Sequence, residues 1–156
     1  MIFSERHKLV TGLAPVADAF SGTVGSDVIN CKNYQKVTFV VYKGVGATGT
    51  ATITVEACDD VTPTNTTAIP FRYRDQQDSD NVTGALTAAT TAGFTTTAGS
   101  AEMYIVEVDV AELGTEGYGY VRLKSVEVVD SPVLGGILCI LSEPRYGKSV
   151  MDAAIA

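Results

Sequence analysis

The sequence predicts an all-β protein: an antiparallel β-sandwich or a jelly-roll-like barrel of about eight strands. In several short runs, apolar and polar residues alternate with period two, which is the pattern of strands with two unlike faces. Thr, Gly, Ala and Val dominate the 156 residues, and this composition suits strands and turns better than helices. We therefore expect a single β domain over residues 21–147, with an N-terminal arm at residues 1–20 and a short C-terminal tail at residues 148–156.

The expected N-terminal arm has weak strand character at residues 8–10, after which Gly12 and Pro15 mark a loop. A segment of this kind is expected to lie over the domain or over a neighbouring subunit. The first strand of the domain is expected over residues 23–31, followed by a turn at Asn33.

Two strongly alternating runs, residues 36–42 and 51–58, flank a glycine-rich connector at residues 44–49. The connector is short enough to join the two runs as an antiparallel hairpin. Its spacing Gly44-x-Gly46-x-x-Gly49 also matches the dinucleotide-binding fingerprint as a string. A second strand follows it, however, instead of a helix whose N-terminus could hold a pyrophosphate. The hairpin is therefore favoured, and no bound cofactor is expected.

The second half of the chain predicts further strands separated by polar or glycine-containing loops. Pro70 places the short strand expected at residues 68–74 at a sheet edge, or at the start of a strand. Gly93 is expected to kink residues 84–97, which form one or two strands. The remaining strands are expected at residues 102–110, 118–129 and 132–141, with a loop at 111–117 and no convincing helix. The tail is expected to form one helical turn or to stay disordered.

The charge and the apolar runs of the chain argue against two classes of partner, nucleic acids and membranes. The formal net charge is −7 and the basic residues are scattered, so binding to a nucleic acid is not expected. No run approaches the roughly 18 apolar residues that span a bilayer, so membrane insertion is not expected. Glu5, Arg6 and Lys8 lie where a signal peptide needs an apolar segment, which predicts synthesis and folding in the cytoplasm.

The three cysteines, Cys31, Cys58 and Cys139, cannot all pair within one chain. We expect them to be reduced, and no two of them have the spacing of metal ligands. Cys139 lies in the apolar run 136–141, which predicts a small residue of the hydrophobic core.

Residues that could carry chemistry are few. Asp75, Asp78 and Asp80 could offer oxygen ligands to a cation, but the EF-hand spacing fails, and a solvated acidic loop is favoured. His7 is the single histidine and falls in the expected arm, which argues against a catalytic role. Four strand carboxylates could supply an acid–base pair but are expected instead to be outward-facing charges: Glu56, Glu107, Asp109 and Glu127. An enzyme is therefore not expected.

Three parts of the sequence carry a resemblance to a known class of protein. Residues 14–16 (APV) close the arm, and residues 33–38 (NYQKVT) lead into an apolar strand. Residues 103–108 (MYIVEV) precede a loop and residues 120–123 (YVRL), and residues 141–146 (LSEPRY) close the domain. In this order they resemble small structural proteins of tailed bacteriophages that are encoded near the major capsid protein. Some of those proteins are capsid decoration, or cement, proteins.

This resemblance implies a non-enzymatic virion protein that binds the outer capsid surface, bridges adjacent capsomers and stabilises the expanded shell by mass action. It also implies a jelly-roll or related β fold that works as a homo-oligomer, a dimer or a trimer, with the major capsid protein as its partner. The two termini are expected to become ordered on binding. The expected contact residues are Ile2, Phe3, Arg6, Arg145, Tyr146 and Met151.

Two other functions remain open from the sequence. One is a structural subunit of the phage tail or neck, which would assemble into rings or tubes. The other is a jelly-roll carbohydrate-binding module that uses a calcium ion in the loop at residues 75–80.

Overall fold

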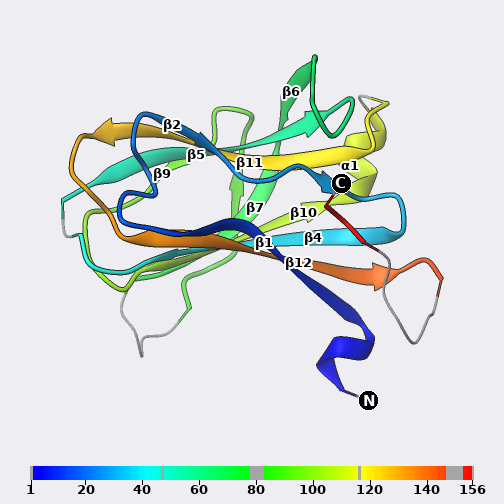
Figure 1. Cartoon of the computed structure of the whole chain (residues 1–156), viewed down its shortest axis with the longest axis horizontal. Helices are drawn as coiled ribbons and strands as arrows, with labels where there is room; N and C mark the ends of the chain where they lie inside the picture. The colour runs from blue at the N-terminus through cyan, green and yellow to red at the C-terminus, as the bar shows by residue number, and fades with distance from the viewer. Residues whose placement is uncertain (1, 47, 78–82, 116, 147–152, 156) are drawn as a thin grey trace.

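The computed structural model confirms the β-sandwich: two antiparallel sheets enclose one hydrophobic core (Figure 1). It describes the whole chain except residues 1, 47, 78–82, 116, 147–152 and 156. The described residues form twelve strands, more than the expected eight, because several expected strands are divided in two. Within the same residues, both sheets remain open and no barrel is closed.

The first sheet, called sheet A, has six strands. In spatial order these are β1 (His7–Val16), β12 (Gly135–Pro144), β4 (Tyr34–Lys43), β10 (Met103–Asp109), β7 (Phe71–Gln76) and β8 (Thr87–Ala89). The second, sheet B, has the order β2 (Thr23–Gly25), β11 (Tyr120–Val129), β5 (Thr50–Cys58) and β6 (Thr66–Ile69). Two short strands complete sheet B: β3 (Ile29–Asn30) pairs with β11, and β9 (Phe94–Thr95) pairs with β5.

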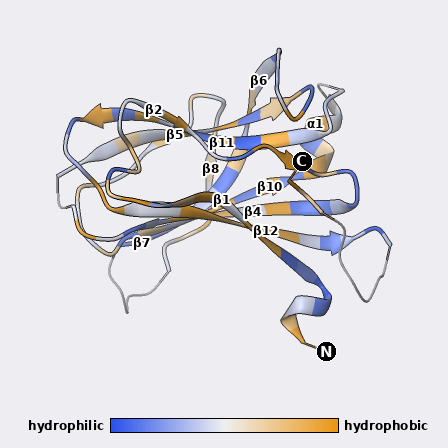
Figure 2. Ribbon diagram, viewed as in Figure 1, coloured by the Kyte–Doolittle hydropathy of each residue, from blue (hydrophilic) through white to orange (hydrophobic). Residues whose placement is uncertain are grey.

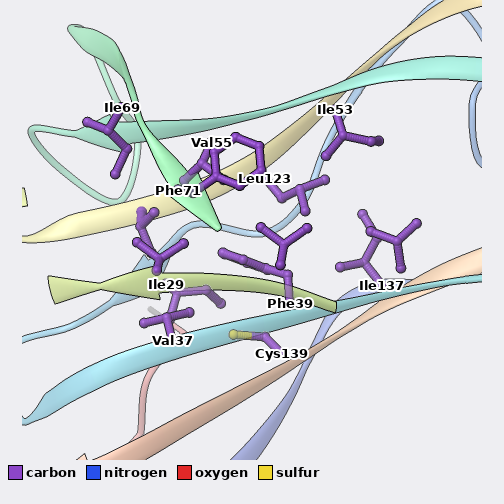
Figure 3. Packing of buried hydrophobic residues seen from close by; sticks show 14 of the residues in the cluster. Ile29, Val37, Phe39, Ile53, Val55, Ile69, Phe71, Leu123, Ile137 and Cys139 are labelled. Carbon is purple, nitrogen blue, oxygen red and sulfur yellow. The ribbon is translucent and has the colours of Figure 1, made fainter. Parts of the chain in front are cut away.

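The core forms where the inward-facing residues of the two sheets meet. Figure 3 shows Phe39 and Cys139 of sheet A pointing toward residues of sheet B such as Val55 and Leu123. All four side chains are completely buried, which confirms the core position expected for Cys139. Burial of this alternating apolar set supplies the main driving force for the fold.

The expected hairpin of residues 36–58 is wrong, although both of its strands exist. β4 lies in sheet A between β12 and β10, whereas β5 lies in sheet B between β11 and β6. The connector therefore crosses from one sheet to the other. The N–H of Gly44 donates to the carbonyl of Leu134 at 2.6 Å, and the N–H of Leu134 donates to Val45 at 2.9 Å, so the loop before β12 holds the crossing. Period two specifies which face of a strand is buried, but it does not specify the partner strand.

Most of the expected N-terminal arm is instead the edge strand β1, which pairs with β12 from His7 opposite Ser142 onward. Register shifts after Thr11 and after Leu13 interrupt the alternation, and this hides the strand in the sequence. A short 3₁₀ helix, η1 (Phe3–Glu5), precedes β1 and projects from the sandwich (Figure 1).

Other segments differ from expectation in smaller ways. The strand expected at residues 23–31 is divided into β2 and β3, and Pro70 lies between β6 of sheet B and β7 of sheet A. The kink expected at Gly93 is confirmed, since this residue has φ of 74° between β8 and β9. The loop expected after β10 contains a short helix, α1 (Val110–Thr115). In the tail, the carbonyl of Ala154 accepts the N–H of Asn30 at 2.8 Å and Ala154 is buried, while residues 148–152 lie outside the described part.

Candidate protein-binding surface

The four carboxylates that could supply an acid–base pair are divided between the two sheets. Glu56 and Glu127 lie on sheet B, whereas Glu107 and Asp109 lie two residues apart on the outer side of β10 in sheet A. Among the described residues, no group of three or more His, Cys, Asp or Glu side chains is arranged to hold a metal ion. Of the expected acidic loop, Asp78 and Asp80 lie outside the described residues.

His7 has structural contacts. Its ring stacks on Phe3 with centroids 4.4 Å apart, and its Nδ1 lies 2.9 Å from the Ser142 hydroxyl. These contacts link η1 to the last strand of the chain, β12. They place the ring at the end of the β1–β12 ladder, where it joins the two strands.

The three cysteines are free and buried. Desolvation by burial, with a smaller contribution from Cys58, raises the pKa of Cys31 to about 12. Burial likewise raises the pKa of Cys58 to about 11 and that of Cys139 still further. Because the thiolate is the reactive form, thiols held this far from ionisation are core residues and not nucleophiles.

Two buried ionic clusters were not foreseen from the sequence. Lys43 Nζ lies 2.6 Å from Glu102 Oε2, and the Thr97 hydroxyl donates to Glu102 Oε1 at 2.9 Å. In sheet B, Arg122 and Lys124 both bind Glu56, at 2.7 and 3.0 Å. Burial alone would raise the pKa of Glu56, but these hydrogen bonds and positive charges hold it below the ordinary glutamate value. Each carboxylate is thus satisfied internally.

An open concavity of about 550 Å³ lies on the outer side of sheet A, near α1. Its lining mixes two basic residues, Lys36 and Arg72, with three acidic ones, Glu107, Asp109 and Glu112. The two signs offset each other, so the concavity has neither the charge of an anion site nor the closed geometry of a cation site.

The outer side of sheet A is instead distinguished by its apolar side chains. One row runs across three strands, where Leu138 lies opposite Val40 and Val40 lies opposite Ile105. The neighbouring rows add Tyr42 opposite Met103 and Leu9 opposite Ile140. We call this set the outer apolar face, and its members are Leu9, Val40, Tyr42, Met103, Ile105, Leu138 and Ile140. The members on β4 and β12 alternate with buried residues, so these two strands carry apolar side chains on both sides.

Three members of the outer apolar face are strongly exposed: Leu9 at 46%, Tyr42 at 52% and Leu138 at 39%. Figure 2 shows hydrophobic positions recurring along β1 and β12, the strands that carry Leu9 and Leu138. The sequence signal for this face was the continuous apolar run of residues 136–141, which the sequence analysis assigned to the core alone. Contiguity of exposed apolar side chains is a feature of protein-binding surfaces, so the outer apolar face is the candidate surface of this fold.

The outer side of sheet B has a different character. Thr52, Thr54 and Glu56 of β5 face it, together with Arg122 and Lys124 of β11. Val126, Val128 and Val129 are exposed at the end of β11, beyond the ionic cluster. The two faces of the sandwich are therefore unlike: the apolar side chains of sheet A extend across four strands, whereas these valines of sheet B lie at the end of one.

The expected contact residues gather at one end of sheet A. His7 pairs with Ser142, so η1, which precedes β1, and the residues that follow β12 emerge side by side. Ile2, Phe3 and Tyr146 are exposed at 63%, 54% and 70%, and Arg6 and Arg145 are exposed as well. Met151 lies outside the described residues. The contact role of these residues stays a prediction, but five of the six share one region of the surface.

The two short helices of the described residues do not have the length and apolar character that crossing a bilayer requires. The fold defines the chain as a β-sandwich protein with two sheets of unlike outer faces. Comparison with models of known protein families gives no match, and comparison with curated proteins gives none either. Among solved structures, the chain is similar to the SPBc2 prophage-derived protein YomS, with a TM-score of 0.48 and 14% sequence identity. That alignment covers 88% of this chain and 93% of YomS.

Proposed function

We propose that this protein is a non-enzymatic structural protein of a phage virion, of the capsid decoration type. In this proposal it binds the outer surface of the shell formed by the major capsid protein and stabilises the expanded state. The observation that carries the proposal is the outer apolar face of sheet A, a rigid surface with exposed Leu9, Tyr42 and Leu138. The sequence resemblance to capsid-associated phage proteins supports the choice of partner.

The geometry suits a protein that binds its partner through the preorganised face of a sheet. The outer apolar face lies on the four longest strands of sheet A, which are fixed from behind by the core. A preorganised sheet loses little conformational entropy when it binds. The exposed termini at the end of the same sheet would extend the contact beyond the face. A ligand that binds only the expanded shell shifts the equilibrium toward that shell.

The direct test is co-sedimentation of the purified protein with empty shells of its own phage, expanded and unexpanded in parallel. We expect saturable binding to expanded shells only. Absence of binding to either shell would overturn the proposal. Assembly of the protein alone into rings or tubes would favour a tail or neck subunit, and calcium-dependent binding to a glycan would favour a carbohydrate-binding module.

A matched pair of variants assigns the binding to the proposed face. Leu138 on sheet A and Val126 on sheet B are both 39% exposed and both point outward from a strand inside their sheet. Leu138→Lys is expected to weaken shell binding by about tenfold or more, because a charge enters a desolvated contact. Val126→Lys, the control, is expected to bind as the unmodified protein does. Equal loss of binding in both variants would show that the outer apolar face is not the contact.

A further inference from the structure

The edge strands of the two sheets differ in length, and one of them, β1, is much longer than the others. The outermost strands β8, β2 and β6 have three, three and four residues, whereas the edge strand β1 has ten. A long edge strand presents a row of N–H and C=O groups to which another strand can pair. Such edges are normally kept short or interrupted, so any regular, uncovered part of β1 is a place where another strand can pair.

Only part of β1 is open on its outer side. The N–H of Asp27 donates to the carbonyl of Gly12 at 2.7 Å, so residue 27 covers the edge at that point. Beyond it, register shifts after Thr11 and after Leu13, together with Pro15, interrupt the edge further. Residues 7–11, by contrast, keep a regular register with β12, and among the described residues no strand pairs with their other side.

We propose that residues 7–11 of β1 pair with the same residues of a second copy of this chain, antiparallel about a two-fold axis at Leu9. The pairing joins two copies of sheet A into one continuous sheet of twelve strands. It does not rest on the proposed virion function, since it follows from the edge itself. A homodimer of this kind has the same surface on both copies, which is the commonest symmetry of soluble oligomers.

The side chains of the segment are complementary in this register. Leu9 of each copy lies opposite Leu9 of the other on the outer side, and both are exposed in the single chain. Lys8 lies opposite Val10, so like charges are not opposed. If the two-fold axis moved to Lys8, two lysines would lie opposite each other. If it moved to Val10, the two leucines would no longer be paired.

Charge complementarity at both ends of the segment fixes the same register. With Leu9 opposite Leu9, the last pair of the ladder is His7 of one copy opposite Thr11 of the other, because Asp27 already covers the edge at Gly12. Arg6 precedes His7, and Arg6 and Asp27 are both exposed, so each Arg6 approaches an Asp27 of the other copy. The two-fold axis makes this contact twice. An opposite-charge pair at each end of a short ladder favours this register over its alternatives.

The pairing also changes the size of the outer apolar face. In an antiparallel pair about a two-fold axis, the outer sides of both sheets point the same way. The outer apolar face fills seven of the twelve outward positions in three rows across four strands, about 230 Å² at ordinary strand spacings, and two copies offer about 470 Å². The doubled face therefore falls in the range of roughly 300–600 Å² for apolar patches that are often functional, which a single copy does not reach.

The experiment is sedimentation velocity over a concentration series with the whole chain alone. We expect the unmodified protein to sediment as a dimer at the upper concentrations. Leu9→Lys places two charges opposite each other at the axis and is expected to raise the dimer Kd by about tenfold or more. Leu138→Lys is the matched control, since it adds the same charge to the outer apolar face one strand away from the edge, and it is expected to leave the dimer Kd unchanged.

Charge reversal tests the register itself. Arg6→Asp and Asp27→Arg are each expected to weaken the dimer, because each one opposes like charges at both ends. An equimolar mixture of the two variants is expected to recover dimerisation, since both contacts in the mixed dimer again join opposite charges. Circular dichroism checks that each variant is folded. A monomer at every concentration, a Leu9→Lys variant that dimerises normally, or a mixture that dimerises no better than its components would each overturn the proposal.

A cysteine variant provides a second, covalent readout. The native cysteines are buried, so a thiol introduced at the edge is the accessible one. Leu9→Cys is expected to give a disulfide-linked dimer on mild oxidation, because the two thiols face each other across the axis. Lys8→Cys is expected to give much less, since each thiol would face Val10. Equal cross-linking of the two variants would contradict the proposed register.

Discussion

Lys43 Nζ lies 2.6 Å from Glu102 Oε2, and these side chains are exposed by only 1% and 3%. Lys43 ends β4, and Glu102 immediately precedes β10, so the pair connects two neighbouring strands of sheet A. Lys43 also donates to the carbonyl of Thr97 at 2.7 Å, and the hydroxyl of Tyr104 donates to Glu102 at 3.2 Å. The charges are thus embedded in a network that satisfies both partners.

Removal of one partner from this pair is expected to be costly. Glu102→Ala leaves the Lys43 ammonium buried without a counter-charge, and we expect the free energy of unfolding to fall by about 3–5 kcal/mol. Glu143→Ala is the control, because Glu143 binds Lys36 at 3.3 Å with both side chains about half exposed. Its loss is expected to cost about 1 kcal/mol or less. Urea unfolding measures both changes. Similar losses in the two variants would show that the buried pair contributes no more to the free energy of unfolding than the exposed pair does.

The ionic cluster around Glu56 predicts a pH dependence of stability. The pKa of Glu56 is lowered in the folded protein, so the folded state favours the ionised carboxylate more than the unfolded chain does. Its contribution is therefore fully present above the unfolded pKa of about 4.3 and is lost as the pH falls through the lower folded pKa. Glu56→Gln should be less stable than the unmodified protein at pH 7, and the difference should shrink in acid. Denaturant unfolding at a series of pH values tests this, and a difference that stays constant with pH would contradict it.

The cysteines are expected to be unreactive in the folded protein. Their burial and raised pKa values keep the thiolate fraction very small, so a thiol-specific reagent such as DTNB should label none of them at pH 8. In guanidinium chloride all three cysteines of the chain should react. Rapid labelling of the folded protein would mean that the core around these residues opens far more readily than its packing indicates.

Gly93 and Gly114 should respond oppositely to the same substitution. Gly93 has φ of 74°, and a Cβ there would overlap the carbonyl oxygen of Ile53, so Gly93→Ala is expected to destabilise by about 2 kcal/mol or more. A Cβ on Gly114 meets no atom within 4 Å, and the residue lies in α1. Gly114→Ala is therefore expected to be neutral or to stabilise by about 0.5–1 kcal/mol. Thermal unfolding compares the two variants, and a destabilised Gly114→Ala would contradict this view of α1.

The fold class could be predicted from the sequence because alternation is local. In β10 the alternation separates Tyr104, Val106 and Val108 from the residues between them, and these three are the buried ones. Strand pairing could not be predicted in the same way, because β4 and β5 alternate equally well as hairpin partners or as members of opposite sheets. β1 was missed because its irregular register breaks the alternation, and α1 because six residues with an internal glycine give too short a helical pattern.

The candidate surface was accessible to sequence reasoning only in part. The terminal residues Phe3 and Tyr146 were expected to contact a partner, and the structure places both, exposed, at one end of sheet A. The outer apolar face joins residues from four strands that are far apart in the chain, such as Leu9, Val40 and Ile105. Its existence depends on strand order, which the sequence does not display.

The crossing of residues 44–49 has a consequence for the dynamics of the fold. It joins β4 and β5, each of which lies between other strands of its own sheet, so neither sheet can separate without displacing a strand of the other. Amide hydrogens in such paired inner strands exchange with solvent only when a whole cooperative unit opens. Those of β4 and β5 should therefore exchange at a common, slow rate despite belonging to different sheets, while the amides of η1 and the outer side of β1 exchange early in the single chain.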